Sequence, residues 1–139
     1  HAHPAPDWRP APEATETDTQ LGQRLIRLIE REQMYLDPDL NLRHLAQALG
    51  EPPNKVSRAI TAGLKAANVN QLINARRIAH AQSLLRDPDR DSLTILQIAL
   101  ESGFNSIGPF NRAFKAITDQ TPREYRRDRT TAAQGLAAE

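Results

Sequence analysis

Cysteine does not occur in this 139-residue sequence, so disulfides, thiolate zinc sites and cysteine nucleophiles are excluded. Aromatic residues make up only 4% of the chain, and the apolar content is mostly Leu, Ile and Ala, which favours an all-helical packing. No apolar run approaches the roughly 20 residues of a membrane-spanning helix, and nothing resembles a signal peptide. No Ser/His/Asp arrangement or pair of carboxylates stands out, and we expect no enzyme, no cofactor and no metal site.

Charge is distributed unevenly along the chain, although the formal net charge is only +1. Residues 41–129 contain 14 Lys and Arg against 8 Asp and Glu, a balance of +6. The remainder contains 4 against 9, a balance of −5. A basic domain behind an acidic N-terminal segment fits a polyanionic partner, and a solvated surface with chance clustering would give the same pattern.

Both ends of the chain are predicted to lie outside the folded domain. Residues 1–17 contain four prolines and little apolar content, which is typical of a disordered linker, and residues 130–139 are expected to form a disordered tail. The sequence begins at His1 rather than at a methionine, so we expect a fragment of a longer protein. A sensor or dimerisation domain, soluble or membrane-anchored, would then lie upstream.

Apolar residues at helical spacing, separated by Pro, Gly and Asn, divide the rest of the chain into helices. The expected elements are a first helix at about 18–36, a first helix-turn-helix at about 42–63, a linker helix at about 68–86, a second helix-turn-helix at about 94–118, and a further helix that starts at Thr121. Asp18 or Thr19 is expected to cap the first helix, and Asn41 the second. Gly50 is expected to end the second helix, and Pro52 and Pro53 to start the third.

The rest of the chain is organised around residues 98–125, IALESGFNSIGPFNRAFKAITDQTPREY. Gly103 lies where a left-handed residue is expected after a helix, and Asn105 or Ser106 can cap the following helix. That helix carries an apolar stripe of Ile107, Phe110, Phe114 and Ile117. A capping box at 121–124, with proline at the first helical position, begins the last helix. The pattern indicates two helices joined by a tight turn, the second with a cationic outer face.

The first helix-turn-helix repeats the plan of the second. Leu45, Ala46 and Gly50 correspond to Ile98, Ala99 and Gly103 at an offset of 53 residues, and Arg58 corresponds to Arg112 at 54. The difference of one residue falls in the turn, where insertions are best tolerated. We interpret the repeat as the duplication of one DNA-reading unit, because core patterning alone does not account for it.

The segments GFNS, PFNRAFK and TPREYR resemble the second helix-turn-helix signature of the AraC/XylS family of transcription regulators. The resemblance extends upstream over LNLRHLAQALG and NARRIAHAQSLL and covers roughly residues 20–127. It implies an all-α fold of about seven helices, in which a long linker helix joins two homeodomain-like lobes. It also implies that two recognition helices, about 34 Å apart, enter successive major grooves of promoter or operator DNA.

The resemblance further implies the setting in which the chain works. Family members are cytoplasmic, nucleoid-associated regulators, usually activators that recruit RNA polymerase. Dimerisation and ligand binding usually belong to another domain, so this fragment is expected to be monomeric.

Carried over by position, the resemblance assigns a DNA contact to each of ten residues. Base contacts are expected from Asn54, Ser57, Arg58, Asn111 and Arg112, and backbone contacts from Lys55, Thr61, Ser106, Gly108 and Lys115. Arginine suits guanine and asparagine suits adenine, because each can form two parallel hydrogen bonds to that base.

The sequence also departs from the family pattern. Gly108 and Pro109 replace side chains that often reach bases, so we expect the first unit to carry most of the base discrimination. The loop at 64–68 lacks the glycine that is common before the linker helix. Arg76 and Arg77 fall in the arginine-rich part of the linker, where either ion pairing between the lobes or phosphate contact is plausible. A helical protein-interaction module that kept the fold without specific DNA binding is the alternative function.

Overall fold

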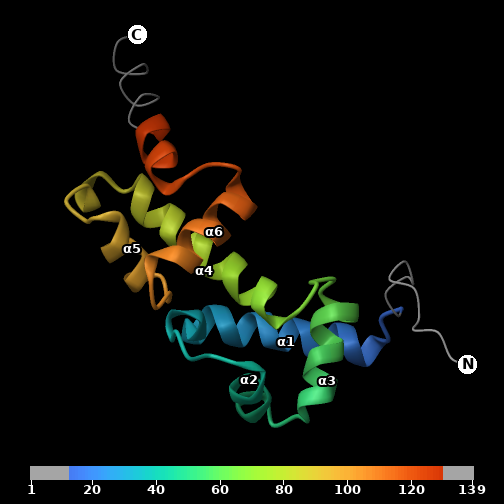
Figure 1. Ribbon diagram of the computed structural model, residues 1–139. Coiled ribbons are helices and arrows are strands. Elements are labelled where there is room, and N and C mark those ends of the chain that lie inside the picture. The colour runs from blue at the N-terminus through green and yellow to red at the C-terminus, as the bar shows by residue number, and fades with distance from the viewer. Residues whose placement is uncertain (1–12, 130–139) are drawn as a thin grey trace, which may run out of the picture.

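The computed structural model describes residues 13–129, and every regular element in this range is helical, so the predicted all-α fold is confirmed (Figure 1). The elements are α1 (Glu16–Glu32), the 3-10 turn η1 (Met34–Leu36), α2 (Leu42–Leu49), α3 (Pro53–Arg58), the π-helical turn η2 (Ala59–Gly63), α4 (Val69–Arg86), the 3-10 turn η3 (Pro88–Arg90), α5 (Ile95–Glu101) and α6 (Ile107–Thr118). A further helix begins at residue 122 and continues to residue 129. Within 13–129, no helix has the length and apolar character required to cross a membrane. The prediction of a disordered linker over residues 1–17 was wrong at its C-terminal end, because Thr15 caps α1 and residues 16 and 17 are helical. The rest of that prediction, for residues 1–12, and the disordered tail expected at 130–139 concern residues outside the described range.

Two separate hydrophobic cores share the long helix α4. The first contains buried residues of α1, α2, α3 and η2 together with Leu72 and Ile73 of α4. The second contains Ile78 and Leu85 of α4 together with buried residues of α5, α6 and the intervening turn. Figure 1 shows the two groups of helices at opposite ends of α4. The predicted architecture of two lobes and one linker helix is therefore present.

Local capping signals account for most helix boundaries. The side chain of Asn41 accepts the backbone N–H of His44 at the start of α2, and the side chain of Asn68 accepts that of Gln71 at the start of α4. Gly50 ends α2 with φ 68°, a left-handed conformation that glycine adopts without strain. The Asn41 cap, the end of α2 at Gly50 and the start of α3 at Pro53 agree with the expectations from sequence, and the Asn68 cap explains why the linker helix begins where it was expected.

The prediction for the start and end of the first helix was wrong. The N-cap is Thr15, whose hydroxyl accepts the backbone N–H of Asp18, while the carboxylate of Asp18 accepts the N–H of Thr15. Asp18 is therefore the third helical residue of a capping box rather than the cap. The helix ends at Glu32, because Gln33 adopts φ 49° and starts a separate 3-10 turn.

The apolar stripe expected on α6 is narrower than its sequence spacing indicates. Phe110 and Phe114 are fully buried, but Ile107 is 38% exposed and Ile117 48% exposed. The second core is filled by a chain of ring contacts that joins Phe104, Phe110, Phe114 and Tyr125. These rings occupy only the middle of the stripe, so its two ends reach the surface.

The faces expected for α4 also needed correction. Helical spacing predicts a buried side that includes Ala75 and Ala79, with Ile73 off that side, but Ile73 is 2% exposed and both alanines are exposed. The reason is that α4 changes partners along its length. Its first turns pack into one lobe and its later turns into the other, so no single stripe is buried throughout.

The loop before α4 contains a left-handed residue at the site where the family glycine is missing. Lys65 has φ 59°, a conformation that L residues with a Cβ disfavour. Just before it, the backbone N–H of Leu64 donates to the carbonyl of Ala59, which closes the π-helical turn η2. A Cβ on Gly63 would lie 2.5 Å from the carbonyl oxygen of Asp18, so this turn lies directly against the start of α1.

Candidate nucleic-acid interface

The first unit buries one side of α3 and exposes the other. Val56 and Ile60 are at most 1% exposed and lie in the first core. Asn54, Lys55 and Ser57 are exposed, and their side chains make no hydrogen bond or ion pair with other residues in the range 13–129. Their polar groups are therefore available to an external partner.

Arg58, in contrast, is bound to the start of α1. Its Nε donates to Oδ2 of Asp18 at 2.9 Å, and its Nη2 donates to the backbone carbonyl of Glu13 at 3.2 Å. The pKa of the Asp18 carboxyl lies below its ordinary value, chiefly because the carboxylate accepts the Thr15 backbone N–H. The hydrogen bond with the Thr15 side chain and the Arg58 charge lower this pKa further, and burial opposes them. Sequence reasoning missed this pair, although the Thr15–Asp18 capping box is visible in the sequence.

Thr61 lies one turn after Ser57, within the π-helical turn η2. It is partly buried, and its hydroxyl donates to the backbone carbonyl of Ser57 at 3.2 Å. The same hydroxyl retains its capacity to accept a hydrogen bond.

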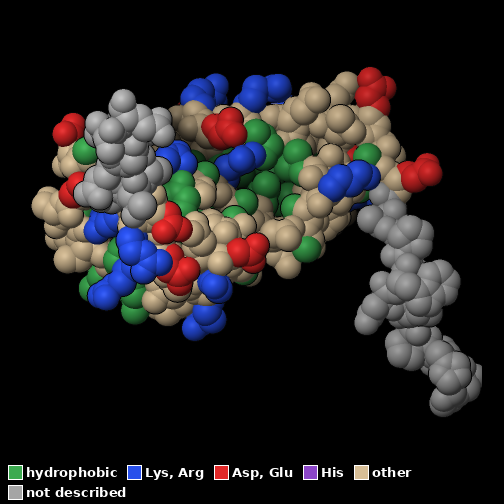
Figure 2. Space-filling model, turned by 90° about the horizontal axis from the view of Figure 1, so that it is seen from above, with side chains coloured by type: hydrophobic (Ala, Val, Ile, Leu, Met, Phe, Trp, Pro, Cys, Tyr) green, Lys and Arg blue, Asp and Glu red, His purple; other side chains and the backbone are tan. Residues whose placement is uncertain are grey.

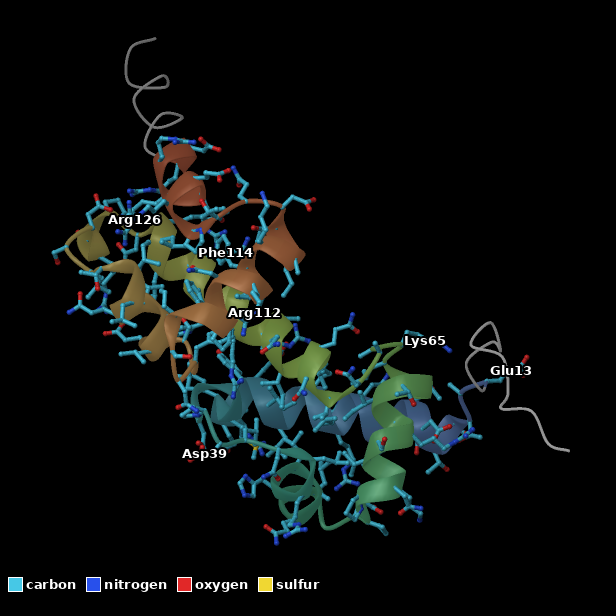
Figure 3. All side chains as sticks on the ribbon, viewed as in Figure 1. Glu13, Asp39, Lys65, Arg112, Phe114 and Arg126 are labelled. Carbon is cyan, nitrogen blue, oxygen red and sulfur yellow. The ribbon has the colours of Figure 1, made fainter. Side chains whose placement is uncertain are left out.

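In the second unit, α6 exposes Asn111 and Arg112, neither of which has a side-chain partner in the part of the chain that the structure describes. Arg112 folds back along its helix, since its Nη1 lies 3.4 Å from where a Cβ on Gly108 would be. Figure 3 shows Arg112 near the middle of the molecule, between the two lobes. A Cβ at position 108 would meet the arginine at an ordinary van der Waals distance, so what sets Gly108 apart is the lack of a side chain of its own.

The remaining predicted contacts of the second unit lie at the two ends of α6. Ser106 is the N-cap, but its side chain makes no capping hydrogen bond, so the hydroxyl and the first backbone amides are available to an anion. Lys115 is exposed and its Nζ donates to the carbonyl of Asp119 at 3.0 Å, at the C-terminal end of the helix. A flexible lysine at the surface can exchange this bond for a phosphate.

The arginines of the linker hold the lobes together. Arg77 donates from Nε to the carbonyl of Tyr35 at 2.7 Å and from Nη2 to the carbonyl of Asp37 at 2.8 Å. Its guanidinium carbon also lies 5.7 Å from the ring centre of Phe104, in the second lobe. Burial lowers the pKa of Arg77, and the nearby Asp37 charge raises it.

Arg76 makes an ion pair of 3.5 Å with Glu30 of α1. Together with the bonds of Arg77, this pair supports the structural one of the two roles considered for the linker arginines.

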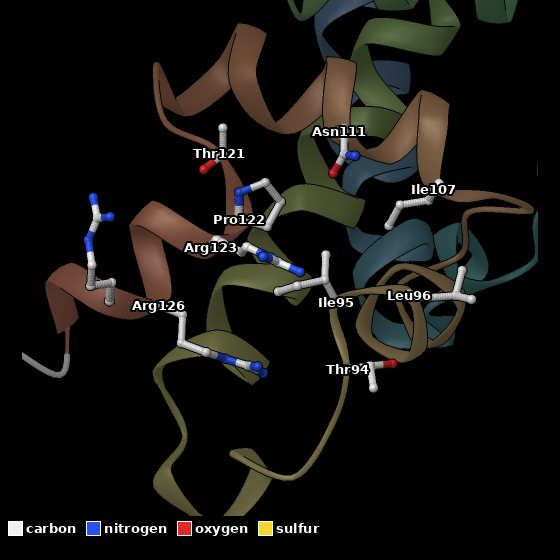
Figure 4. Close-up of a pocket in the computed structure, with 10 residues that line it drawn as sticks. Thr94, Ile95, Leu96, Ile107, Asn111, Thr121, Pro122, Arg123 and Arg126 are labelled. Atoms are coloured by element: carbon white, nitrogen blue, oxygen red, sulfur yellow. The ribbon is translucent and has the colours of Figure 1, made fainter.

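A groove of about 980 Å³, which sequence reasoning missed, lies beside α6. Figure 4 shows its apolar floor, including Ile95, Ile107 and Pro122, with Arg123 extending over it. It is bounded by α5, the first half of α6 and the helix at 122–129. The signal for it is Ile107 at the N-terminal end of the apolar stripe, which lines the groove and is 38% exposed.

On the face drawn in Figure 2, positive charge does not form one continuous patch. Figure 2 shows Lys and Arg interspersed with Asp and Glu around a hollow where hydrophobic side chains are visible. The part of the surface best suited to a polyanion is therefore the set of unpaired polar and cationic side chains on α3 and α6.

Comparison with known proteins agrees with this reading of the fold. A family model described as a helix-turn-helix domain matches residues 45–128. The chain is 36% identical over 97 residues to an uncharacterized HTH-type transcriptional regulator of Staphylococcus aureus strain COL, a match that covers 70% of this chain and 12% of that protein. It is 31% identical over 112 residues to the uncharacterized HTH-type transcriptional regulator YijO of Escherichia coli K12, covering 78% of this chain and 38% of YijO. The chain thus spans only a small part of the length of these relatives.

Solved structures with the same arrangement of helices come from several bacteria. The C-terminal domain of AraT, a response regulator from Geobacillus stearothermophilus, matches with a TM-score of 0.65 at 25% identity, over 82% of this chain and 86% of that one. A DNA-binding transcriptional dual regulator from Escherichia coli K-12 matches with the same TM-score at 19% identity, over 78% and 96% of the two chains. At 19% identity, the second likeness concerns the fold alone.

Proposed function

Because the chain belongs to the AraC-type helix-turn-helix family of DNA-binding regulators, we propose that it binds double-stranded DNA sequence-specifically, with α3 and α6 in successive major grooves. The observation that carries this proposal is the repeated unit itself. In both copies, the second helix of the unit buries its apolar side in a separate core and exposes polar side chains that have few or no internal partners. One continuous helix, α4, connects the two copies and limits how far they can move apart.

Within this proposal, side chains on the two recognition helices share the contacts. Asn54, Ser57, Arg58, Asn111 and Arg112 read base edges, and Lys55, Thr61, Ser106, Gly108 and Lys115 face the phosphate backbone. Gly108 acts through its backbone alone, so the first unit carries more of the base discrimination than the second.

The proposal extends to the protein of which this domain is a part. Binding at promoters in the cytoplasm, as a transcription activator that contacts RNA polymerase, is the role we assign to it. The signal that the protein senses would be received by another domain, and this domain alone would be monomeric.

Selection from a random duplex pool at about 150 mM salt, followed by a salt titration of the enriched site, tests the proposal. We expect a bipartite motif whose half-sites are about 10–11 base pairs apart, one for each recognition helix. A single enriched half-site would mean that one unit only anchors. Binding without any enrichment, lost steeply as salt rises, would leave phosphate attraction alone and contradict sequence-specific reading.

Replacing Lys115 with Ala separates phosphate contacts from base contacts. We expect affinity to fall alike for all sequences, with the slope of log affinity against log salt reduced by about one, because one phosphate contact is lost. Arg31→Ala is the matched control, since Arg31 is an exposed cation at the end of α1 with 75% of its side chain accessible. An equal effect of both variants would show that Lys115 acts only through the net charge.

The groove beside α6 favours a second candidate function, that of a protein-interaction module. Leu96 and Ile107 line it and are 48% and 38% exposed, and exposed apolar side chains gathered in one groove are typical of a protein-interaction site. If the duplex pool yields no enriched motif at any salt concentration, this function takes precedence.

A further inference from the structure

The start of α1 and the recognition helix α3 are joined by an ion pair that spans 40 residues of sequence. Asp18 and Arg58 form it, and the backbone carbonyl of Glu13 adds a second acceptor. This contact lies at the end of the first lobe that is remote from the second lobe, where Figure 3 labels Glu13 and Lys65. The ion pair does not contact the second lobe, so any role that it has lies within the first unit.

The two hydrogen bonds use only one edge of the Arg58 guanidinium. Nε–H and one N–H of Nη2 form the side edge of this planar group, and these are the donors to Asp18 and Glu13. The end edge, formed by Nη1 and the second N–H of Nη2, has no acceptor among the residues 13–129. Two parallel N–H donors on one edge are what an arginine needs to bind N7 and O6 of guanine. With 43% of its side chain exposed, Arg58 can present this edge to DNA.

Breaking the ion pair between Arg58 and Asp18 would be costly, also when DNA is bound. The Asp18 side chain is only 8% exposed, so departure of the guanidinium would leave a buried carboxylate without its cation. The carboxylate itself is fixed by the Thr15 backbone N–H, at 3.0 Å. The Asp18 carboxylate is therefore a fixed anchor, and Arg58 keeps one orientation when the major groove of DNA approaches α3.

We propose that Asp18 is a positioning residue for DNA recognition: it grips the side edge of Arg58 and thereby aims the end edge at a guanine. The proposal rests on the proposed function of the domain. It predicts an asymmetry between the two units, because Arg112, the counterpart of Arg58, has no such partner in the described chain. Base preference is accordingly sharper under α3 than under α6.

The test is duplex selection with the wild type, Asp18→Asn, Arg58→Ala and the double variant, with Glu16→Gln as the matched control. Asparagine keeps an oxygen that can accept the Thr15 N–H but removes the charge that holds Arg58. Glu16 lies in the same first turn, is exposed and makes no contact with Arg58, so its substitution reports the effect of losing one negative charge near DNA.

We expect Asp18→Asn and Arg58→Ala to lose preference for guanine at the same single base pair, by roughly 5- to 150-fold for Arg58→Ala and by about tenfold for Asp18→Asn. The double variant should discriminate no worse than Arg58→Ala alone, and Glu16→Gln should keep the wild-type preference. Preference retained in Asp18→Asn overturns the proposal. So does a gain in affinity beyond that of Glu16→Gln, since it would mean that Asp18 competes with DNA for the arginine.

Thermal melting of each variant guards against loss of the fold. If Asp18→Asn does not fold, Asp18→Ser decides, because serine also removes the carboxylate that holds Arg58 and leaves the arginine itself unchanged. Guanine preference retained by a folded Asp18→Ser overturns the proposal, and its loss supports it. Failure of the wild type to enrich any motif would instead refute the proposed function, and this inference with it.

Discussion

Replacing Gly103 with Ala tests how closely the turn of the second unit packs against the first lobe. Gly103 has φ 96°, and an added Cβ would lie 2.2 Å from the carbonyl oxygen of Tyr35 and 2.9 Å from Nε of Arg77. The nearest obstacle is backbone, which cannot rotate away as a side chain can. An ordinary contact of 3.4 Å would require the turn and η1 to separate by about 1.2 Å.

The destabilisation has two components. An L residue with a Cβ in a left-handed conformation costs about 1–2 kcal/mol, and overpacking in a rigid site costs about 1–3 kcal/mol more. Together they give a loss of about 2–5 kcal/mol in the free energy of unfolding. Separation of the turn from η1 would also strain the 2.7 Å bond between Arg77 and the Tyr35 carbonyl.

Gly50→Ala isolates the first component. Gly50 has φ 68°, but nothing lies within 4 Å of an added Cβ, so only the backbone cost of about 1–2 kcal/mol applies. Urea unfolding of both variants, followed by circular dichroism, gives the two free energies. We expect Gly103→Ala to lose at least 1 kcal/mol more than Gly50→Ala, the lower end of the overpacking range of about 1–3 kcal/mol. Equal losses would refute the close packing of this junction.

Three further predictions concern stability. Lys65→Gly should raise the free energy of unfolding by about 0.5–1 kcal/mol, because it removes left-handed strain, while Lys65→Ala should leave it unchanged in the same urea-unfolding assay. Ser102→Ala should be neutral or stabilising by up to about 1 kcal/mol, since the Ser102 hydroxyl is buried without a hydrogen bond to any described residue; a clear loss in the same assay would reveal a partner for it. The lowered pKa of Asp18 means that its contribution to stability is complete above about pH 4 and is lost as the pH falls through the folded pKa. Melting temperatures between about pH 2 and 6 should therefore fall less steeply for Asp18→Asn than for the wild type, and parallel profiles would contradict the assignment.

Short-range chemistry made the helix boundaries predictable. Asn41, Gly50 and Asn68 each act on a backbone group within four residues of themselves, and such patterns are visible in sequence. The first helix shows the limit of this reasoning. Asp18 is a good capping residue by type, but Thr15 three residues earlier forms a complete capping box and the helix begins there.

Burial was less predictable than helix position, because it depends on the size of the partner. Helical spacing identified the face of α6 that carries Phe110 and Phe114, but not that the second core would end before Ile107 and Ile117. How much of the stripe is buried depends on the aromatic rings that fill the second core. Helical spacing alone does not show where that core ends. The groove beside α6 is the consequence, since the surface that remains uncovered is apolar.

The residues expected to face DNA could be named from the repeat and the family pattern, but not their internal partners. The Asp18–Arg58 pair joins residues 40 positions apart, and the sequence around either residue contains no pattern that predicts the contact. For Arg77 the signal is weaker still, because its acceptors are the backbone carbonyls of Tyr35 and Asp37. Every residue has a backbone carbonyl, so the residue type at the acceptor position does not indicate such a contact.

These hidden contacts bear on how two recognition helices could act together. Reading two grooves at a fixed spacing requires that the lobes keep their separation, and a single helix can still bend or twist between them. Arg77 adds a second connection, because it binds the first lobe through two carbonyls and lies over Phe104 of the second. Gly103 allows that connection to form by bringing the turn within contact of Tyr35. The side chains on α3 and α6 would then determine which bases are bound. The contacts of Arg77 and Gly103 with the first lobe would set the distance between the two half-sites.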